Sequence, residues 1–177
     1  MDGKLIVSSS PHISSPVKTK NIMFDVIIAL IPSLAASIYF FGPRAAVITI
    51  VSVATCVIAE YICRKVMKRE QTIGDLSAVV TGILLAFNLP SSVPIYVPII
   101  GGLVAIVMVK QMFGGLGQNF VNPALLARII LMNSFPVLMT TWYPAGSFGA
   151  DTTATASPLA NIAAGSVDAL PSYMDMF

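Results

Sequence analysis

Long apolar runs separated by short polar breaks dominate the sequence between Ile22 and Leu138. Glycine, proline and charged residues mark the breaks, and the runs between them cover residues 22–41, 45–63, 75–89, 93–109 and 120–139. An α-helix rises about 1.5 Å per residue, so roughly 20 apolar residues cross a hydrocarbon core of about 30 Å. The pattern therefore predicts a bundle of about five transmembrane helices within residues 22–139.

Glycine and proline interrupt several of these runs. The run at 75–89 is shorter than a full span and ends before Pro90, because the residue preceding a proline is disfavoured in a helix. Pro32 lies in the middle of the run at 22–41, where it predicts a kink. Such interruptions are tolerated in membrane helices when neighbouring groups satisfy the backbone, and they are typical of half-helices that line a site.

The composition favours a membrane protein over a soluble one. Of the 177 residues, 56% are hydrophobic and only 10% are charged, whereas soluble domains carry about 25% charged residues. The predicted fold class is therefore an all-α integral membrane bundle with an extracytoplasmic polar tail. The net charge of +2 and the position of the basic residues at segment ends give no basic stripe for binding nucleic acid.

The basic residues predict the orientation of the bundle. Lys18 and Lys20 precede the first run, and the loop at 64–69 holds the densest group of lysines and arginines. Lysine and arginine collect on the cytoplasmic side of short loops. We therefore expect a multi-pass protein of the cytoplasmic (inner) membrane, with segment 1–21 inside and segment 140–177 outside.

Three charged residues inside the runs are candidates for function. Asp25 could favour the start of a helix electrostatically or mark an ion or proton path, and the sequence leaves both open. Glu60 is expected to reach the membrane surface and pair with Arg64. Arg128 is deep in its run and needs a partner, either an acid such as Asp25 or Asp75, or a ligand such as a cofactor phosphate.

Metal-ligating residue types are scarce. Cys56 and Cys63 lie two helical turns apart, too far for a disulfide, and we interpret them as packing residues. His12, the one histidine, is expected to be an exposed tail residue. No metal site is predicted. Lys110 is expected to end the fourth run at the cytoplasmic side.

The predicted outer tail contains a hydroxyl-rich stretch, residues 151–159, with the sequence Asp-Thr-Thr-Ala-Thr-Ala-Ser-Pro-Leu. One interpretation is structural, because a serine before a proline is a good start for a helix near Pro158. The other interpretation, modification of a hydroxyl, depends on the following resemblance.

Several stretches resemble the D subunit of the Rnf complex, a membrane-bound ferredoxin:NAD oxidoreductase, and its relative, the B subunit of the sodium-pumping NADH:quinone oxidoreductase. These stretches are residues 9–12, 25–32, 81–90 and 110–128. The family's subunit is about twice as long and has a second set of spans. We therefore expect this chain to be the N-terminal half, with more sequence beyond Phe177.

The resemblance implies an FMN joined through its phosphate to a hydroxyl side chain as a phosphoester. The family's attachment pattern is similar to Asp-x-x-(Ser/Thr)-Gly-Ala-Thr, commonly followed by Pro-Leu. Asp151 matches the aspartate, and residues 158–159 match the trailing pair. The acceptor then falls on Ser157, which we prefer, whereas a shifted register places it on Thr155. Arg128 is the further candidate for cofactor contact.

The resemblance also implies a function and partners. The subunit would relay electrons between ferredoxin and NAD, coupled to Na⁺ or H⁺ transport, without being catalytically complete alone. A flavin transferase, membrane lipid and the other membrane and peripheral subunits are the expected partners, and riboflavin is a candidate second, non-covalent flavin. Two alternatives remain open: a transporter or channel half-protein without a redox cofactor, and a scaffold subunit that binds no cofactor.

The predicted topology can be tested by cysteine labelling. A Gly149→Cys variant should react with an impermeant thiol reagent in intact cells, because the tail is expected outside. A Met67→Cys variant in the basic loop should react only after lysis. Labelling of position 149 only after lysis would reverse the orientation.

Overall fold

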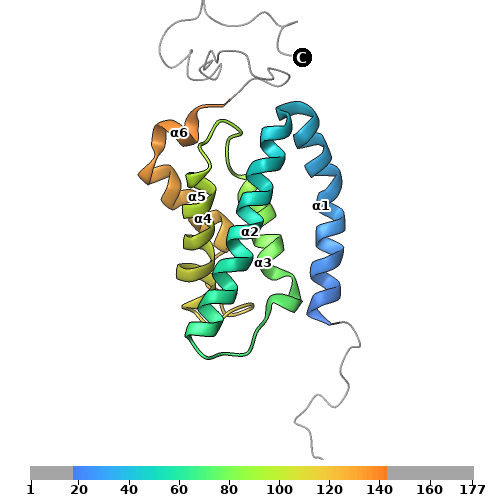
Figure 1. Ribbon diagram of the computed structural model, residues 1–177, viewed down its shortest axis with the longest axis vertical. Helices are drawn as coiled ribbons and strands as arrows, with labels where there is room; N and C mark the ends of the chain where they lie inside the picture. The colour runs from blue at the N-terminus through green and yellow to red at the C-terminus, as the bar shows by residue number, and fades with distance from the viewer. Residues whose placement is uncertain (1–17, 143–177) are drawn as a thin grey trace, which may run out of the picture.

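The computed structural model describes residues 18–142 and shows a bundle of helices joined by short connections (Figure 1). The elements in chain order are α1 (Thr19–Phe41), α2 (Pro43–Val66), η1 (Ile73–Asp75), α3 (Ser77–Phe87), α4 (Tyr96–Leu103), η2 (Val104–Gln111), α5 (Pro123–Ser134) and α6 (Pro136–Thr140). Within the described ranges there is no β-strand. The predicted cytoplasmic segment, except its last residues, and the predicted flavin-attachment loop lie outside these residues.

The two longest helices form an antiparallel hairpin (Figure 1). Gly42 joins them with φ of +77°, a conformation that glycine adopts readily, and Pro43 begins α2 where its missing N–H costs nothing. Both helices are long and apolar enough to cross a membrane, with mean hydropathies of 2.0 and 2.1. Helix α1 packs on the side of the bundle against α2 and α3 and has no buried residue in the described structure.

The remaining helices are shorter. Helix α4 continues without a break into η2, which has π-helical geometry, so the predicted run at 93–109 becomes one helix of two geometries. The predicted span at 120–139 is divided in two at Phe135 and Pro136. Phe135 has φ of −133° and ψ of 60°, because a residue before proline is pushed out of helical geometry. The proline was visible in the sequence, but its effect on this run was not anticipated.

The main core lies between α2, α3, α4 with η2, and α5. It is built by apolar side chains from these elements, from their connections and from α6: Ile48, Leu85, Ala86, Leu89, Val93, Val97, Ala105, Ala124, Ala127, Leu131 and Met139. Several exposed apolar side chains on α1 and α5 lie outside this core, as expected for surfaces that meet lipid or another membrane segment. The all-α membrane fold class is therefore confirmed.

Helices α2 and α3 approach closely at Gly82. The Ser52 hydroxyl donates to the Gly82 carbonyl oxygen at 2.9 Å, which joins the two helices inside the bundle. A Cβ atom placed on Gly82 would lie 2.6 Å from the Cα atom of Val53. Small residues allow this kind of backbone approach between membrane helices.

Replacing Gly82 should therefore weaken the α2–α3 contact. Gly82→Ala is expected to cost about 1–3 kcal/mol of stability, because neither backbone can yield without shifting a helix. The matched control is Gly74→Ala, since a Cβ at Gly74 has no atom within 4 Å. Thermal unfolding of the detergent-purified full-length protein measures both, and equal midpoints for the two variants would contradict the prediction.

Candidate functional site

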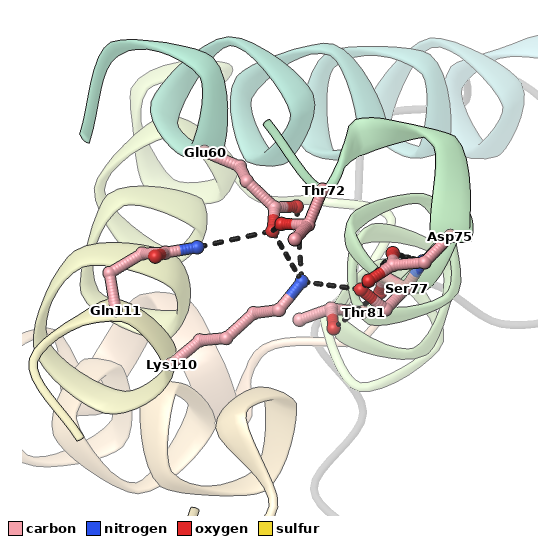
Figure 2. A network of polar contacts seen from close by, with 7 residues as sticks. All are labelled: Glu60, Thr72, Asp75, Ser77, Thr81, Lys110 and Gln111. Atoms are coloured by element: carbon pink, nitrogen blue, oxygen red, sulfur yellow. Dashed lines mark hydrogen bonds and ion pairs between the residues drawn. The ribbon is translucent and has the colours of Figure 1, made fainter. Parts of the chain in front are cut away.

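A buried ion pair joins α2 to the end of η2 (Figure 2). The Lys110 ammonium lies 2.9 Å from Oε1 and 3.0 Å from Oε2 of Glu60. The two side chains are 2% and 0% exposed. Among residues 18–142 this is the only salt bridge. Ionisable groups inside a membrane bundle commonly mark ion or proton paths.

Two further side chains donate hydrogen bonds to the Glu60 carboxylate. The Thr72 hydroxyl, from the connection after α2, donates to Oε1 at 2.9 Å, and the Gln111 amide donates to the same oxygen at 3.1 Å. Gln111 is as deeply buried as Lys110. The carboxylate thus has donors from the α2–η1 connection and from η2, which compensates part of the cost of removing its charge from water.

The Lys110 ammonium also reaches the start of α3. It donates to the Ser77 hydroxyl at 2.5 Å, and that hydroxyl donates to Oδ1 of Asp75 at 2.5 Å. The backbone N–H of Ser77 donates to the same aspartate oxygen at 2.8 Å. Figure 2 shows these side chains converging from α2, η1, α3 and η2. We call the set Glu60, Thr72, Asp75, Ser77, Lys110 and Gln111 the polar network.

Local backbone geometry places Ser77 in the polar network. Leu76 has φ of +64°, an unusual conformation for a residue with a side chain, and it turns the chain from η1 into α3. The Asp75 carboxylate then lies at the N-terminus of α3, where a negative charge is favourable and an unpaired N–H needs an acceptor.

One prediction about a charged residue is wrong. Glu60 does not reach the membrane surface to pair with Arg64, because α2 continues to Val66 and Glu60 faces the bundle interior. Lys110 lies one residue before the end of η2, close to the predicted end of its run, and its side chain is buried in the bundle. An acid about one turn before the end of one apolar run and a lysine directly after the end of another were the signal that could have suggested the pair.

Arg128 contacts an amide rather than an acid. Its Nη1 donates to Oδ1 of Asn88 at 2.9 Å, and the Asn88 amide donates to the Leu84 carbonyl oxygen at 2.8 Å. The arginine thus holds the C-terminal end of α3 against α5. Asp25 is exposed on α1, and the Asp75 carboxylate accepts a hydrogen bond from Ser77. The prediction that one of these two acids pairs with Arg128 is therefore wrong. Contact between Arg128 and a flavin stays a prediction.

The predicted attachment residues, Asp151, Thr155 and Ser157, lie outside the described residues, as does His12. Cys56 and Cys63 are both free thiols, and the former is buried. Between residues 18 and 142, no group of three or more His, Cys, Asp or Glu side chains could hold a metal ion.

A cavity of about 300 Å³ lies at the other end of α2 from the polar network. It is lined by the C-terminal half of α1, the start of α2 and the end of α3, with aromatic and hydroxyl-bearing side chains among its residues: Ser33, Ser37, Phe40, Phe87, Ser91 and Trp142. The Ser91 hydroxyl is buried and has no hydrogen-bond partner among the described residues. The cavity lies beside Trp142, the last described residue before the predicted attachment loop.

The family model and the similar proteins agree on one family. The NQR2, RnfD, RnfE family matches residues 6–177. The D subunit of the Na⁺-translocating ferredoxin:NAD⁺ oxidoreductase complex of Acetobacterium woodii is 47% identical over 98% of the chain and 54% of that relative. The D subunit of the proton-translocating ferredoxin:NAD⁺ oxidoreductase complex of Clostridium ljungdahlii is 41% identical over 86% of the chain and 46% of that relative.

A third relative, the D subunit of an ion-translocating oxidoreductase complex of Shewanella amazonensis, is 42% identical over 93% of the chain and 44% of that relative. The chain therefore spans about half the length of the relatives it matches.

Because the ion pair is buried, we expect the loss of either charge to destabilise the folded protein strongly while the other charge remains. Lys110→Met or Glu60→Gln alone should cost about 3–5 kcal/mol, because each leaves a buried charge without its partner. The double variant should cost clearly less than the sum of the two. Unfolding of the full-length protein in a buffer without alkali metal ions measures this. Additive costs would contradict the prediction. Lys68→Met, at an exposed lysine, should change stability by no more than about 0.5 kcal/mol.

Proposed function

Because the chain belongs to the NQR2, RnfD, RnfE family, we propose that it forms half of the membrane subunit of an ion-translocating electron-transport complex. The observation that carries this proposal is the Glu60–Lys110 pair, a charged site inside an apolar bundle. Ionisable residues inside membrane segments are costly and rare, and they commonly mark ion or proton paths. The names of the relatives, which describe ion-translocating oxidoreductases, support the same function.

In this proposal, electrons pass between reduced ferredoxin and NAD while Na⁺ or H⁺ crosses the cytoplasmic membrane. Relatives are named for each of the two ions, so similarity does not choose between them. Ferredoxin and NAD bind other subunits, and this subunit relays electrons and contributes to the ion path. The N-terminus is cytoplasmic and residues 151–157 are outside, as the basic residues at 64–69 predict.

The redox group in the proposal is an FMN that a flavin transferase attaches to Ser157, with Thr155 as the alternative acceptor. Flavin supplies reversible electron transfer, while the protein supplies position and electrostatics. Asp151 belongs to the attachment pattern. Riboflavin is retained as a candidate second, non-covalent flavin.

The cavity near Trp142 fits an aromatic ring system with polar edges. Phe40, Phe87 and Trp142 offer flat apolar surfaces, and Ser33 and Ser37 bring hydroxyl groups to the lining. Its volume of about 300 Å³ suits such a group. These residues would hold the ring. Arg128 acts from the same end of α3, through its bond to Asn88.

A transporter or channel half-protein without a redox cofactor is the second candidate. The π-helical segment η2 and the divided span at Phe135 favour it, because transporters build sites at interrupted helices. The two candidates differ in one observable: flavin absorbance that survives denaturation is expected only for the first.

Flavin attachment can be tested by variants of the full-length subunit produced with a flavin transferase. Ser157→Ala should abolish in-gel flavin fluorescence and the mass increase due to FMN, whereas Thr155→Ala should retain both. Ser157→Thr should preserve or increase the modified fraction, because threonine offers the same hydroxyl with fewer rotamers. The reverse pattern would assign the attachment site to Thr155. A wild-type protein whose mass is not increased by FMN would contradict attachment of a flavin to this loop.

A further inference from the structure

The Lys110 ammonium occupies a position that resembles a site for an alkali metal ion. Three oxygen atoms surround Nζ: the two carboxylate oxygens of Glu60, at 2.9 and 3.0 Å, and the Ser77 hydroxyl at 2.5 Å. The group is almost fully buried, so these protein oxygens replace water around the charge. Oxygen atoms in a dry pocket are also the ligands that hard cations prefer.

Further oxygen ligands lie beside the carboxylate. The Thr72 hydroxyl contacts Glu60 Oε1. The Gln111 amide presents its nitrogen to that oxygen, while its own Oε1 is buried without a partner among the described residues. A half-turn of this amide would exchange its nitrogen for an oxygen. We call Glu60, Thr72, Ser77 and Gln111 the oxygen cage. Glu60 is the carboxylate that bonds the ammonium directly, whereas the Asp75 carboxylate is bonded by Ser77 at the N-terminus of α3. One carboxylate at the ammonium matches one positive charge, which favours a monovalent over a divalent cation.

The backbone gives Lys110 a way to leave the oxygen cage. The lysine lies near the end of η2, and π-helical segments are rare and frequent at functional sites. Conversion of one turn to α-helical geometry changes the register by one residue, which rotates the following side chains by about 100°. The loop that follows can absorb the shift, because Gly114, Gly115 and Gly117 all have positive φ.

We propose that Lys110 is a tethered counter-ion that alternates with a transported monovalent cation in the oxygen cage. With the ammonium inside, the cage is neutral and closed to the cation. With η2 shifted, one cation takes the place of the ammonium and keeps the cage neutral. The proposal rests on the proposed ion translocation and names the binding site and the residue that competes for it.

Lys110→Met tests the proposal in the assembled complex, because methionine keeps an unbranched side chain that is one atom shorter and carries no charge. The thermal midpoint of this variant should rise with added Na⁺ and saturate, at ionic strength held constant with choline chloride, because a ligand that binds only the folded state stabilises it. The half-saturating Na⁺ concentration should be at least about tenfold lower than in the wild type. The matched control, Glu60→Gln with Lys110→Met, should show no dependence on Na⁺.

Several outcomes would overturn the proposal. One is a Lys110→Met complex whose midpoint of thermal unfolding does not change with added Na⁺. Another is a variant that fails to assemble in Na⁺ and in choline alike while the double variant assembles, because Na⁺ would then not replace the ammonium.

A measurement on the wild-type complex is independent of these variants. Excess Na⁺ should increase deuterium uptake in residues 104–111 by about twofold, since the displaced lysine loosens η2. Ser77→Ala, which removes one cage oxygen, should reduce this response, and an unchanged uptake in Na⁺ would contradict the proposal. Ferredoxin-dependent NAD reduction by the same complex tests the proposed function separately, and its failure would leave the cation site standing.

Discussion

The Glu60–Lys110 pair is the constraint on which the arrangement of the bundle depends. A charge without a partner in this interior would cost several kcal/mol, so as long as Lys110 is the counter-ion of Glu60, α2 and η2 keep the register that holds the two side chains together. The bonds from Lys110 to Ser77 and from Thr72 to Glu60 extend that constraint to α3 and to the connection after α2. A network of this kind specifies one packing among the many that an apolar bundle allows.

Helix α2 connects two sites with different chemistry. Near its C-terminal end lies the polar network, beside the basic loop that is expected inside the cell. Near its N-terminal end lies the cavity of about 300 Å³, beside the start of the tail that is expected outside. The close contact between Ser52 and Gly82 ties α2 to α3 between them. In the proposed function, these ends serve ion passage and electron transfer respectively, and a rigid α2–α3 pair provides a physical connection between them.

The sequence predicted the parts that depend on local pattern. Apolar runs and their breaks placed the helices to within a few residues, since hydropathy and proline act within a segment. The ion pair was missed because its residues are 50 positions apart and each had a plausible local role at a helix end. The π-helical geometry of η2 has no signal in composition or periodicity. Pro136 did carry a signal for the break in the last span, through its effect on Phe135. The predicted flavin site lies outside the described residues.

The central claim is that the polar network works on transported ions and is more than a contact between helices. The most direct test is ion uptake per NAD reduced, in proteoliposomes that contain the complete complex with Glu60→Gln and Lys110→Met together. This double variant removes both charges and leaves no unpaired one, so the bundle should remain folded. We expect ferredoxin-driven NAD reduction and bound flavin to persist while ion uptake per NAD falls at least about tenfold. An unchanged ratio of ion uptake to NAD reduction would contradict the claim.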